Sequence, residues 1–169
     1  ALKALEEPLI NSGQHNPAQR RKVIDDVLQK VRLSPTLLAR KVSALSGGQA
    51  QRLALARALL CQPEILILDE VVSALDVSIQ SEILTLLENL QKDLGLTYIF
   101  VSHDLSVIKR LSHEVLILKN GEQIEYGKTE QIFSKPMTDY TKHLIASIPG
   151  LTSSPQTAES PDQTNTTGH

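Results

Sequence analysis

The sequence has little of the residue types that mark several protein classes. Its 169 residues include one cysteine, no tryptophan, three tyrosines and two phenylalanines. The single thiol, Cys61, excludes an internal disulfide and any four-thiolate metal or iron–sulfur centre built by this chain alone. No apolar run approaches the roughly 18 residues that a membrane-spanning helix needs. With 17 basic and 19 acidic residues, bulk charge gives no support for nucleic-acid binding.

The composition is nevertheless that of a folded domain. Hydrophobic residues make up 41% of the chain, which is enough for a core, and the length suits one domain with appendages. The first ten residues carry Lys3, Glu6 and Glu7, so they do not resemble a secretory signal. The chain starts without methionine, and its first residues already have a helical pattern. We therefore expect it to be part of a longer protein.

The pattern of apolar residues changes near Leu45. Residues 1–45 have helical spacing and predict a small helical layer. From there on, short aliphatic runs alternate with helical stretches, which predicts a parallel α/β sheet with helices on both faces. The run Glu64–Asp69 predicts a strand buried on both faces, Thr97–Val101 a second buried strand and Val115–Leu118 a third strand.

Between and after these strands, short signals set the helix ends and turns. Gly95 closes a helix that begins at Val77, and Asp104 is placed to cap a short helix. Asn120-Gly121 predicts a hairpin turn, and residues 136–148 read as a terminal helix. The polar residues from 150 onward predict disorder.

Polar side chains follow two of the predicted strands. Asp69 and Glu70 come after the first, and His103 follows the second. Ligands of open α/β sheets bind beyond the carboxyl ends of the strands. An acid pair there suits a magnesium–phosphate site, in which one carboxylate faces the metal and the other orients and deprotonates water. Taken alone, acids at a strand end are as readily the start of a solvated loop.

A glycine-containing helix start provides a second candidate site. In Ser46-Gly47-Gly48-Gln49, the glycines let backbone N–H groups approach a phosphate closely, and the positive end of the helix dipole adds attraction. The alternative is a purely structural role, in which the serine caps the helix and the glycines are flexible.

The order of these motifs resembles the ATPase subunit of an ABC transporter. Leu45–Gln49 resembles the signature motif, Ile65–Glu70 the Walker B strand, Ser73–Asp76 the D-loop and His103 the switch histidine. Flanking segments, including Val72–Gln80 and the stretch from Pro136 to Pro149, are similar to those of the subfamily for dipeptide, oligopeptide and nickel uptake. The resemblance implies the C-terminal part of a P-loop NTPase domain, with a partial helical subdomain (1–45), an ATPase core (46–135), a C-terminal extension (136–149) and a disordered tail (150–169).

The family resemblance also implies roles for single residues. Ser46, Gly47, Gly48 and Gln49 would contact the γ-phosphate of ATP held mainly by a second ATPase subunit, and Asp76 would cross the dimer interface. Asp69 would serve Mg²⁺, Glu70 would act on the attacking water and His103 would hold the γ-phosphate. Further implied partners are membrane permease subunits and, indirectly, a solute-binding protein, but no nucleic acid. The implied location is peripheral, on the cytoplasmic face of the inner membrane.

Three departures from the family pattern matter. The sequence contains no GxxxxGK[ST] phosphate loop, since Gly121 lies one residue too early to complete Gly127-Lys128-Thr129. We therefore expect that loop and the Q-loop to precede Ala1, and the chain alone to bind no appreciable ATP and to be inactive as an ATPase. Val71 stands where the family usually has proline, and residues 42–44 differ at a place where the family contacts membrane subunits.

Two other interpretations stay open. A non-transport ABC ATPase of DNA repair or chromosome structure would carry a coiled coil, for which the spacing from Leu45 to His103 leaves no room. The translation-associated relatives usually lack the histidine. A truncated, non-catalytic remnant would fit the missing phosphate loop. The sequence upstream of Ala1 would decide between the remnant and the ATPase.

Overall fold

The computed structural model describes residues 1–13 and 16–148. It divides into two compact units, residues 1–115 and residues from 116 onward. The predicted disordered tail, 150–169, lies outside the described residues. Among the helices described, none is both long and apolar enough to cross a membrane.

The first unit begins with a helical layer. Asn16 caps the second helix, because its Oδ1 accepts the N–H groups of Ala18 and Gln19 at 3.0 and 3.3 Å. Ser34 caps only a short 3₁₀ turn. The elements of this layer are α1 (Leu2–Asn11), α2 (Pro17–Lys30), the 3₁₀ turns η1 (Pro35–Ala39) and η2 (Val42–Ala44), and α3 (Gly47–Leu59).

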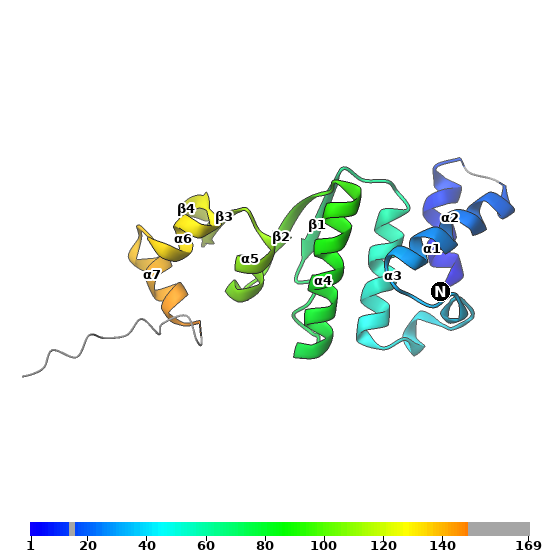
Figure 1. Ribbon diagram of the computed structural model, residues 1–169, viewed down its shortest axis with the longest axis horizontal. Coiled ribbons are helices and arrows are strands. Elements are labelled where there is room, and N and C mark those ends of the chain that lie inside the picture. Colours follow the sequence, from blue (N-terminus) through cyan, green and yellow to red (C-terminus); the bar gives the residue numbers. More distant parts are fainter. Residues whose placement is uncertain (14–15, 149–169) are drawn as a thin grey trace, which may run out of the picture. The chain divides into compact units, whose positions relative to one another are not determined.

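Helix α3 is central to the packing of this unit. It contacts α1, α2 and α4 (Val77–Leu94), and α4 lies beside it in Figure 1. The apolar stripes of these helices share one core. Its least exposed side chains are aliphatic: Leu5, Ile24, Leu28, Val31, Ile83, Leu86 and Leu87.

Two parallel strands, β1 (Ile65–Asp69) and β2 (Thr97–Val101), pair with Ile67 opposite Ile99. Leu66 and Leu68 face the core, whereas Ile67 is 67% exposed and Ile99 is 51% exposed. The prediction of strands buried on both faces is therefore wrong for the described chain. The reason is that its helices cover only the face to which Leu66 and Leu68 point.

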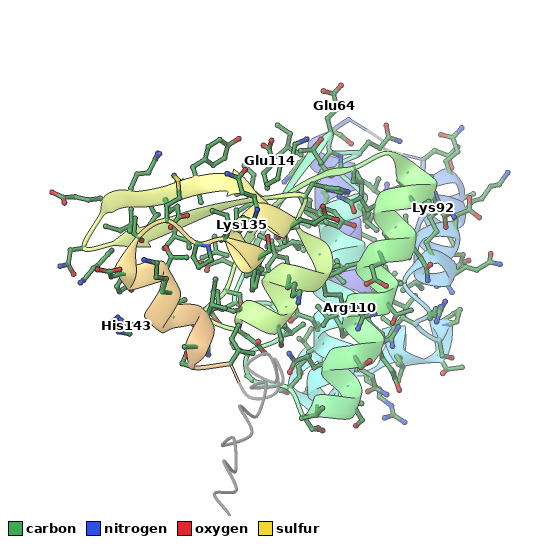
Figure 2. The ribbon with its side chains drawn as sticks, turned by 60° about the vertical axis from the view of Figure 1, so that its left-hand side comes forward. Glu64, Lys92, Arg110, Glu114, Lys135 and His143 are labelled. Carbon is green, nitrogen blue, oxygen red and sulfur yellow. The ribbon has the colours of Figure 1, made fainter. Side chains whose placement is uncertain are left out.

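Helix α4 ends as predicted and is joined to the next helix by an arginine. Gly95 ends α4 in the left-handed conformation, with φ of 65°. Asp104 caps α5 (Leu105–Leu111) by accepting the Ser106 N–H at 2.9 Å. From α5, Arg110, which is labelled in Figure 2, donates to both carboxylate oxygens of Glu88 on α4, at 2.6 and 3.0 Å.

The second unit is built on a β-hairpin. Strand β3 (Glu114–Lys119) turns at Asn120 and Gly121, whose φ values of 53° and 82° suit a two-residue hairpin turn. It pairs with β4 (Glu122–Lys128) in a separate two-stranded sheet. The expectation that β3 adds to the parallel sheet is thus wrong within the described residues, because the tight turn returns the chain alongside β3.

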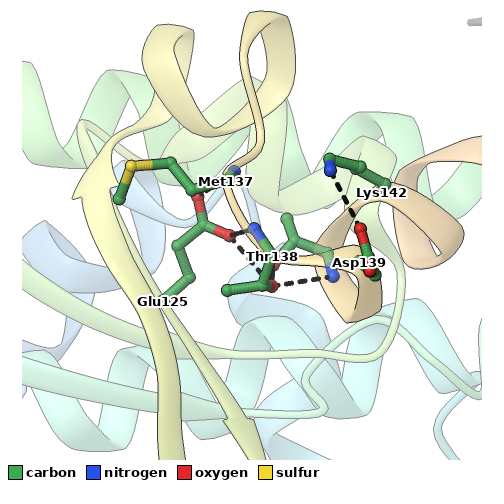
Figure 3. Close-up of polar contacts among 6 residues, drawn as sticks. Glu125, Met137, Thr138, Asp139 and Lys142 are labelled. Carbon is green, nitrogen blue, oxygen red and sulfur yellow. Dashed lines mark hydrogen bonds and ion pairs between the residues drawn. The ribbon is translucent and has the colours of Figure 1, made fainter.

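Two short helices follow the hairpin, α6 (Thr129–Ser134) and α7 (Asp139–Ala146). Glu125 of β4, only 5% exposed, fixes the start of α7 (Figure 3). Its carboxylate accepts the backbone N–H groups of Met137 and Thr138, at 2.9 and 3.2 Å. Thr138 in turn caps α7 by accepting the Thr141 N–H at 3.2 Å. The sequence predicts the terminal helix but not α6 or this buried anchor.

Candidate functional site

Glu70 and His103 meet at the carboxyl ends of β1 and β2. Glu70 Oε1 accepts the backbone N–H of His103 at 3.1 Å and lies 2.9 Å from its Nδ1. The hydrogen bond from the His103 side chain is the main cause that holds the pKa of Glu70 below its ordinary value. Glu70 is thus a carboxylate at neutral pH, as a group that accepts a proton from water must be.

The second oxygen of the same carboxylate is left unpaired. Glu70 Oε2 is buried and has no hydrogen-bond partner among the described residues. A buried carboxylate oxygen without a partner is costly, so a polar ligand or water fits this position. The side chain of His103, 78% exposed, borders the same place.

The backbone of Glu70 explains why its side chain points to His103. Its φ is 49°, in the left-handed region that residues other than glycine rarely adopt. The Glu70 N–H still donates to the Val101 carbonyl at 3.0 Å, and Ser73 Oγ donates to the Glu70 carbonyl at 2.9 Å. The chain therefore leaves β1 in a fixed turn.

Asp69 is the last residue of β1, opposite Val101. By strand alternation it shares the open face with Ile65 and Ile67, and it is exposed. The described residues contain no group of three or more His, Cys, Asp or Glu able to hold a metal by themselves. Magnesium at phosphate sites uses one or two carboxylates and takes its other ligands from phosphate and water. Asp69 with its neighbour Glu70 fits such a shared site.

The signature-like segment forms the exposed tip of α3. Ser46 is the N-cap: its Oγ accepts the Gln49 N–H at 3.4 Å, and its own N–H donates to Gln49 Oε1 at 3.1 Å. The first turn of a helix leaves N–H groups without intrahelical acceptors, and here that turn contains Gly47 and Gly48. The tip can therefore receive an anion from outside the chain, while the Gln49 side chain serves as a cap.

Asp76 lies at the start of α4, next to this tip. It is the N-cap residue, yet its side chain makes no capping hydrogen bond and is exposed. The two glycines pack against the same stretch of chain. A Cβ added to Gly47 would come within 3.1 Å of Leu75, and one added to Gly48 within 2.7 Å of Ile79.

Sequence reasoning missed one side chain that supports these groups, Gln80, whereas for Arg52 it left two alternatives: a structural or interface ion pair, or contact with nucleotide across the dimer. Gln80 of α4 donates to Asp104 Oδ2 at 3.3 Å, and so holds the loop that carries His103. Arg52 is 12% exposed and donates to the Val31 carbonyl and to Glu82, at 3.1 and 3.0 Å. Arg52 thus joins helices within the chain, the structural alternative for that residue. The partner of Gln80 had no signal in the sequence, since 24 positions separate the pair.

Comparisons with known proteins agree with this geometry. The sequence model of the ABC transporter family matches residues 3–73. A dipeptide transport ATP-binding protein, DppF of Haemophilus influenzae, is 45% identical over 87% of this chain and 45% of its own length. An oligopeptide transport ATP-binding protein, AppF of Bacillus subtilis, is 39% identical over 86% of this chain and 44% of its own length. The dimeric ATP-binding cassette MJ0796, solved with ADP and Pi, superposes with a TM-score of 0.63 at 33% identity, covering 75% of this chain and 56% of the other.

These matches show which type of fold the chain has. The chain has the α/β fold of part of a P-loop NTPase domain of the ABC ATPase type. Within that class it is similar, over most of its length, to ATP-binding proteins of dipeptide and oligopeptide transport, which confirms the resemblance seen in the sequence. The chain spans less than half the length of these two relatives.

Proposed function

We propose that this chain is the C-terminal part of an ATP-hydrolysing subunit that powers peptide import through an ABC transporter. The observation that carries the proposal is the contact between Glu70 and His103 at the carboxyl ends of β1 and β2. A carboxylate kept ionised at the end of β1 is suited to orient and deprotonate water. Peptide as the solute rests on the relatives of dipeptide and oligopeptide transport.

In this proposal the nucleotide site is shared between two ATPase subunits. The tip of α3, from Ser46 to Gln49, binds the γ-phosphate of an ATP whose other phosphates a partner subunit cradles. This division suits an exposed helix start that offers backbone N–H groups to an anion. Asp76, exposed beside the tip, crosses to the partner. The dimeric state of the cassette MJ0796 supports the same arrangement.

Within the chain's own site, each group has one task. Asp69 holds Mg²⁺, which would supply charge neutralisation at the phosphates. Glu70 orients the attacking water and accepts its proton, and His103 holds the γ-phosphate. The subunit works peripherally, on the cytoplasmic face of the membrane, with permease subunits that receive solute from a binding protein.

The decisive experiment is Glu70→Gln in the full polypeptide that contains these residues. Turnover of ATP should fall by about 100-fold or more, because the general base is lost while the side chain keeps its shape. ATP-driven dimerisation, measured by size-exclusion chromatography with light scattering, should persist. Cells that carry the variant should lose uptake of a labelled dipeptide.

The matched control is Glu64→Gln. Glu64 is also exposed, but it precedes the opposite end of β1. This substitution should leave turnover and uptake as they are. An unchanged ATPase rate in Glu70→Gln would remove Glu70 from its assigned role, and uptake unaffected by that variant would remove peptide import.

A further inference from the structure

Gly48 and Ile79 form a close packing point between α3 and α4. A Cβ atom at position 48 would lie 2.7 Å from the Cγ2 methyl of Ile79, closer than side chains pack in folded proteins. Gly48 is in the first turn of α3, and Ile79 is in the first turn of α4. The missing side chain at 48 therefore sets how closely the two helix starts approach.

The Ile79 methyl belongs to a stiff side chain. Ile79 is β-branched, and a β-branched side chain in a helix keeps one strongly preferred χ1 rotamer. It packs against the core next to Ile83, which lies one turn further along α4 and is fully buried. The neighbouring contact differs: at Gly47, the atom met at 3.1 Å is Cδ2 of Leu75, the far end of a more adaptable side chain.

The contact joins two groups that the proposed function assigns to the shared nucleotide site. On one side are the N–H groups at the tip of α3. On the other is Asp76, the N-cap of α4, three residues before Ile79. Close-packed contacts transmit strain, so a displacement at one of these groups is passed to the other.

We infer that Ile79 is a positioning residue, whose Cγ2 methyl against Gly48 holds the tip of α3 and Asp76 as one unit. This inference rests on the proposed function for what the unit presents to the partner's ATP. It also gives Gly48 a task beyond close approach to phosphate: the position is glycine because the same chain occupies the space of a side chain.

The test combines Gly48→Ala with two substitutions of Ile79 in the full polypeptide. Ile79→Leu removes the Cγ2 methyl but keeps the side-chain volume, whereas Ile79→Val keeps the Cγ2 methyl and the branch at Cβ and is the matched control. In the wild-type and Ile79→Val backgrounds, Gly48→Ala should lower ATP turnover per folded molecule by about 100-fold, as misplaced reacting groups do. In the Ile79→Leu background the loss should be about tenfold smaller, and what remains is the effect of a Cβ at position 48 on the close approach to phosphate.

Thermal melting gives a readout that does not need ATP. With Cγ2 present, Gly48→Ala should lower the melting temperature by about 2–4 °C. In the Ile79→Leu background, Gly48→Ala should raise the melting temperature, because alanine is a better helix former than glycine. Turnover is measured well below melting, so a change in stability alone would leave the rate per folded molecule unaltered.

Each outcome decides a different claim. Equal effects of Gly48→Ala in all backgrounds, on turnover and on melting, would overturn the inference. Reversal in melting without rescue of turnover would overturn the positioning role and leave only packing. A wild-type protein that hydrolyses no ATP would refute the proposed function, and the melting data would still decide the contact between Gly48 and Ile79.

Discussion

Glu70 combines a reactive side chain with a backbone that most residues avoid. At φ of 49°, it carries conformational strain of the order of 1–3 kcal/mol, which the turn offsets through the hydrogen bonds to Val101 and from Ser73. The strain turns the carboxylate out of the strand alternation and toward His103. The sequence predicts an acid at the strand end, but it holds no signal for this backbone conformation, since glutamate is not a typical left-handed residue.

This strain predicts that two replacements of Glu70 differ in stability although both remove the carboxyl function. Asparagine tolerates the left-handed region, whereas a β-branched residue does not. Glu70→Val should therefore unfold in urea with a free energy about 1–2 kcal/mol lower than Glu70→Asn. At Glu64, where φ is not positive, the same pair should not show this penalty for valine. Equal stabilities of the two Glu70 variants would rule out strain at this residue.

At the scale of elements, the hydrogen bonds of Glu125 attach α7 to the hairpin. Burial favours a higher pKa for this carboxyl group, but hydrogen bonds from Thr141, Met137 and Thr138 outweigh it and hold the pKa below the ordinary 4.5. The periodicity from Pro136 predicts a helix there. The anchor could not be predicted, because a glutamate in an exposed-looking strand gives no sign of a partner 12 residues away.

The lowered pKa predicts that acid releases α7. A carboxyl group with a depressed folded-state pKa stabilises the fold above its unfolded value and loses that contribution as the pH falls through the folded value. Amide hydrogen exchange of α7 should therefore stay slow above pH 4.5 and accelerate below it, after correction for intrinsic rates. Glu125→Gln should remove most of this pH dependence. Slow exchange in the wild type well below pH 4 would contradict the role of Glu125 as the anchor.

Across the whole molecule, the alternation of strands and helices and their caps follow from the sequence, but burial does not. A run such as Ile65–Leu68 reads as buried on both sides, because aliphatic residues occupy every position. In the described chain only alternate residues are covered, since the other face has no helix against it. The composition of a strand shows whether it could be buried on both faces. Which face is actually buried depends on the elements that pack against it. The same limit applies to Gly48, whose neighbour lies 31 positions away.

The open face of β1 and β2 makes a prediction for the isolated chain. Its exposed aliphatic side chains form a patch of the kind that drives association. Replacing Ile67 and Ile99 with threonine keeps the β-branch and removes apolar surface, so self-association measured by light scattering should fall. The free energy of unfolding should change by no more than about 0.5 kcal/mol for each.

The control for this experiment is the neighbouring residue on the covered face. Leu66 is 8% exposed, so Leu66→Thr should cost on the order of 2–5 kcal/mol, as the loss of a buried leucine does. Similar substitutions at adjacent positions of one strand would then differ several-fold in the free energy of unfolding that they remove. If Ile67→Thr proves as destabilising as Leu66→Thr, Ile67 is not on an open face, and the prediction is wrong.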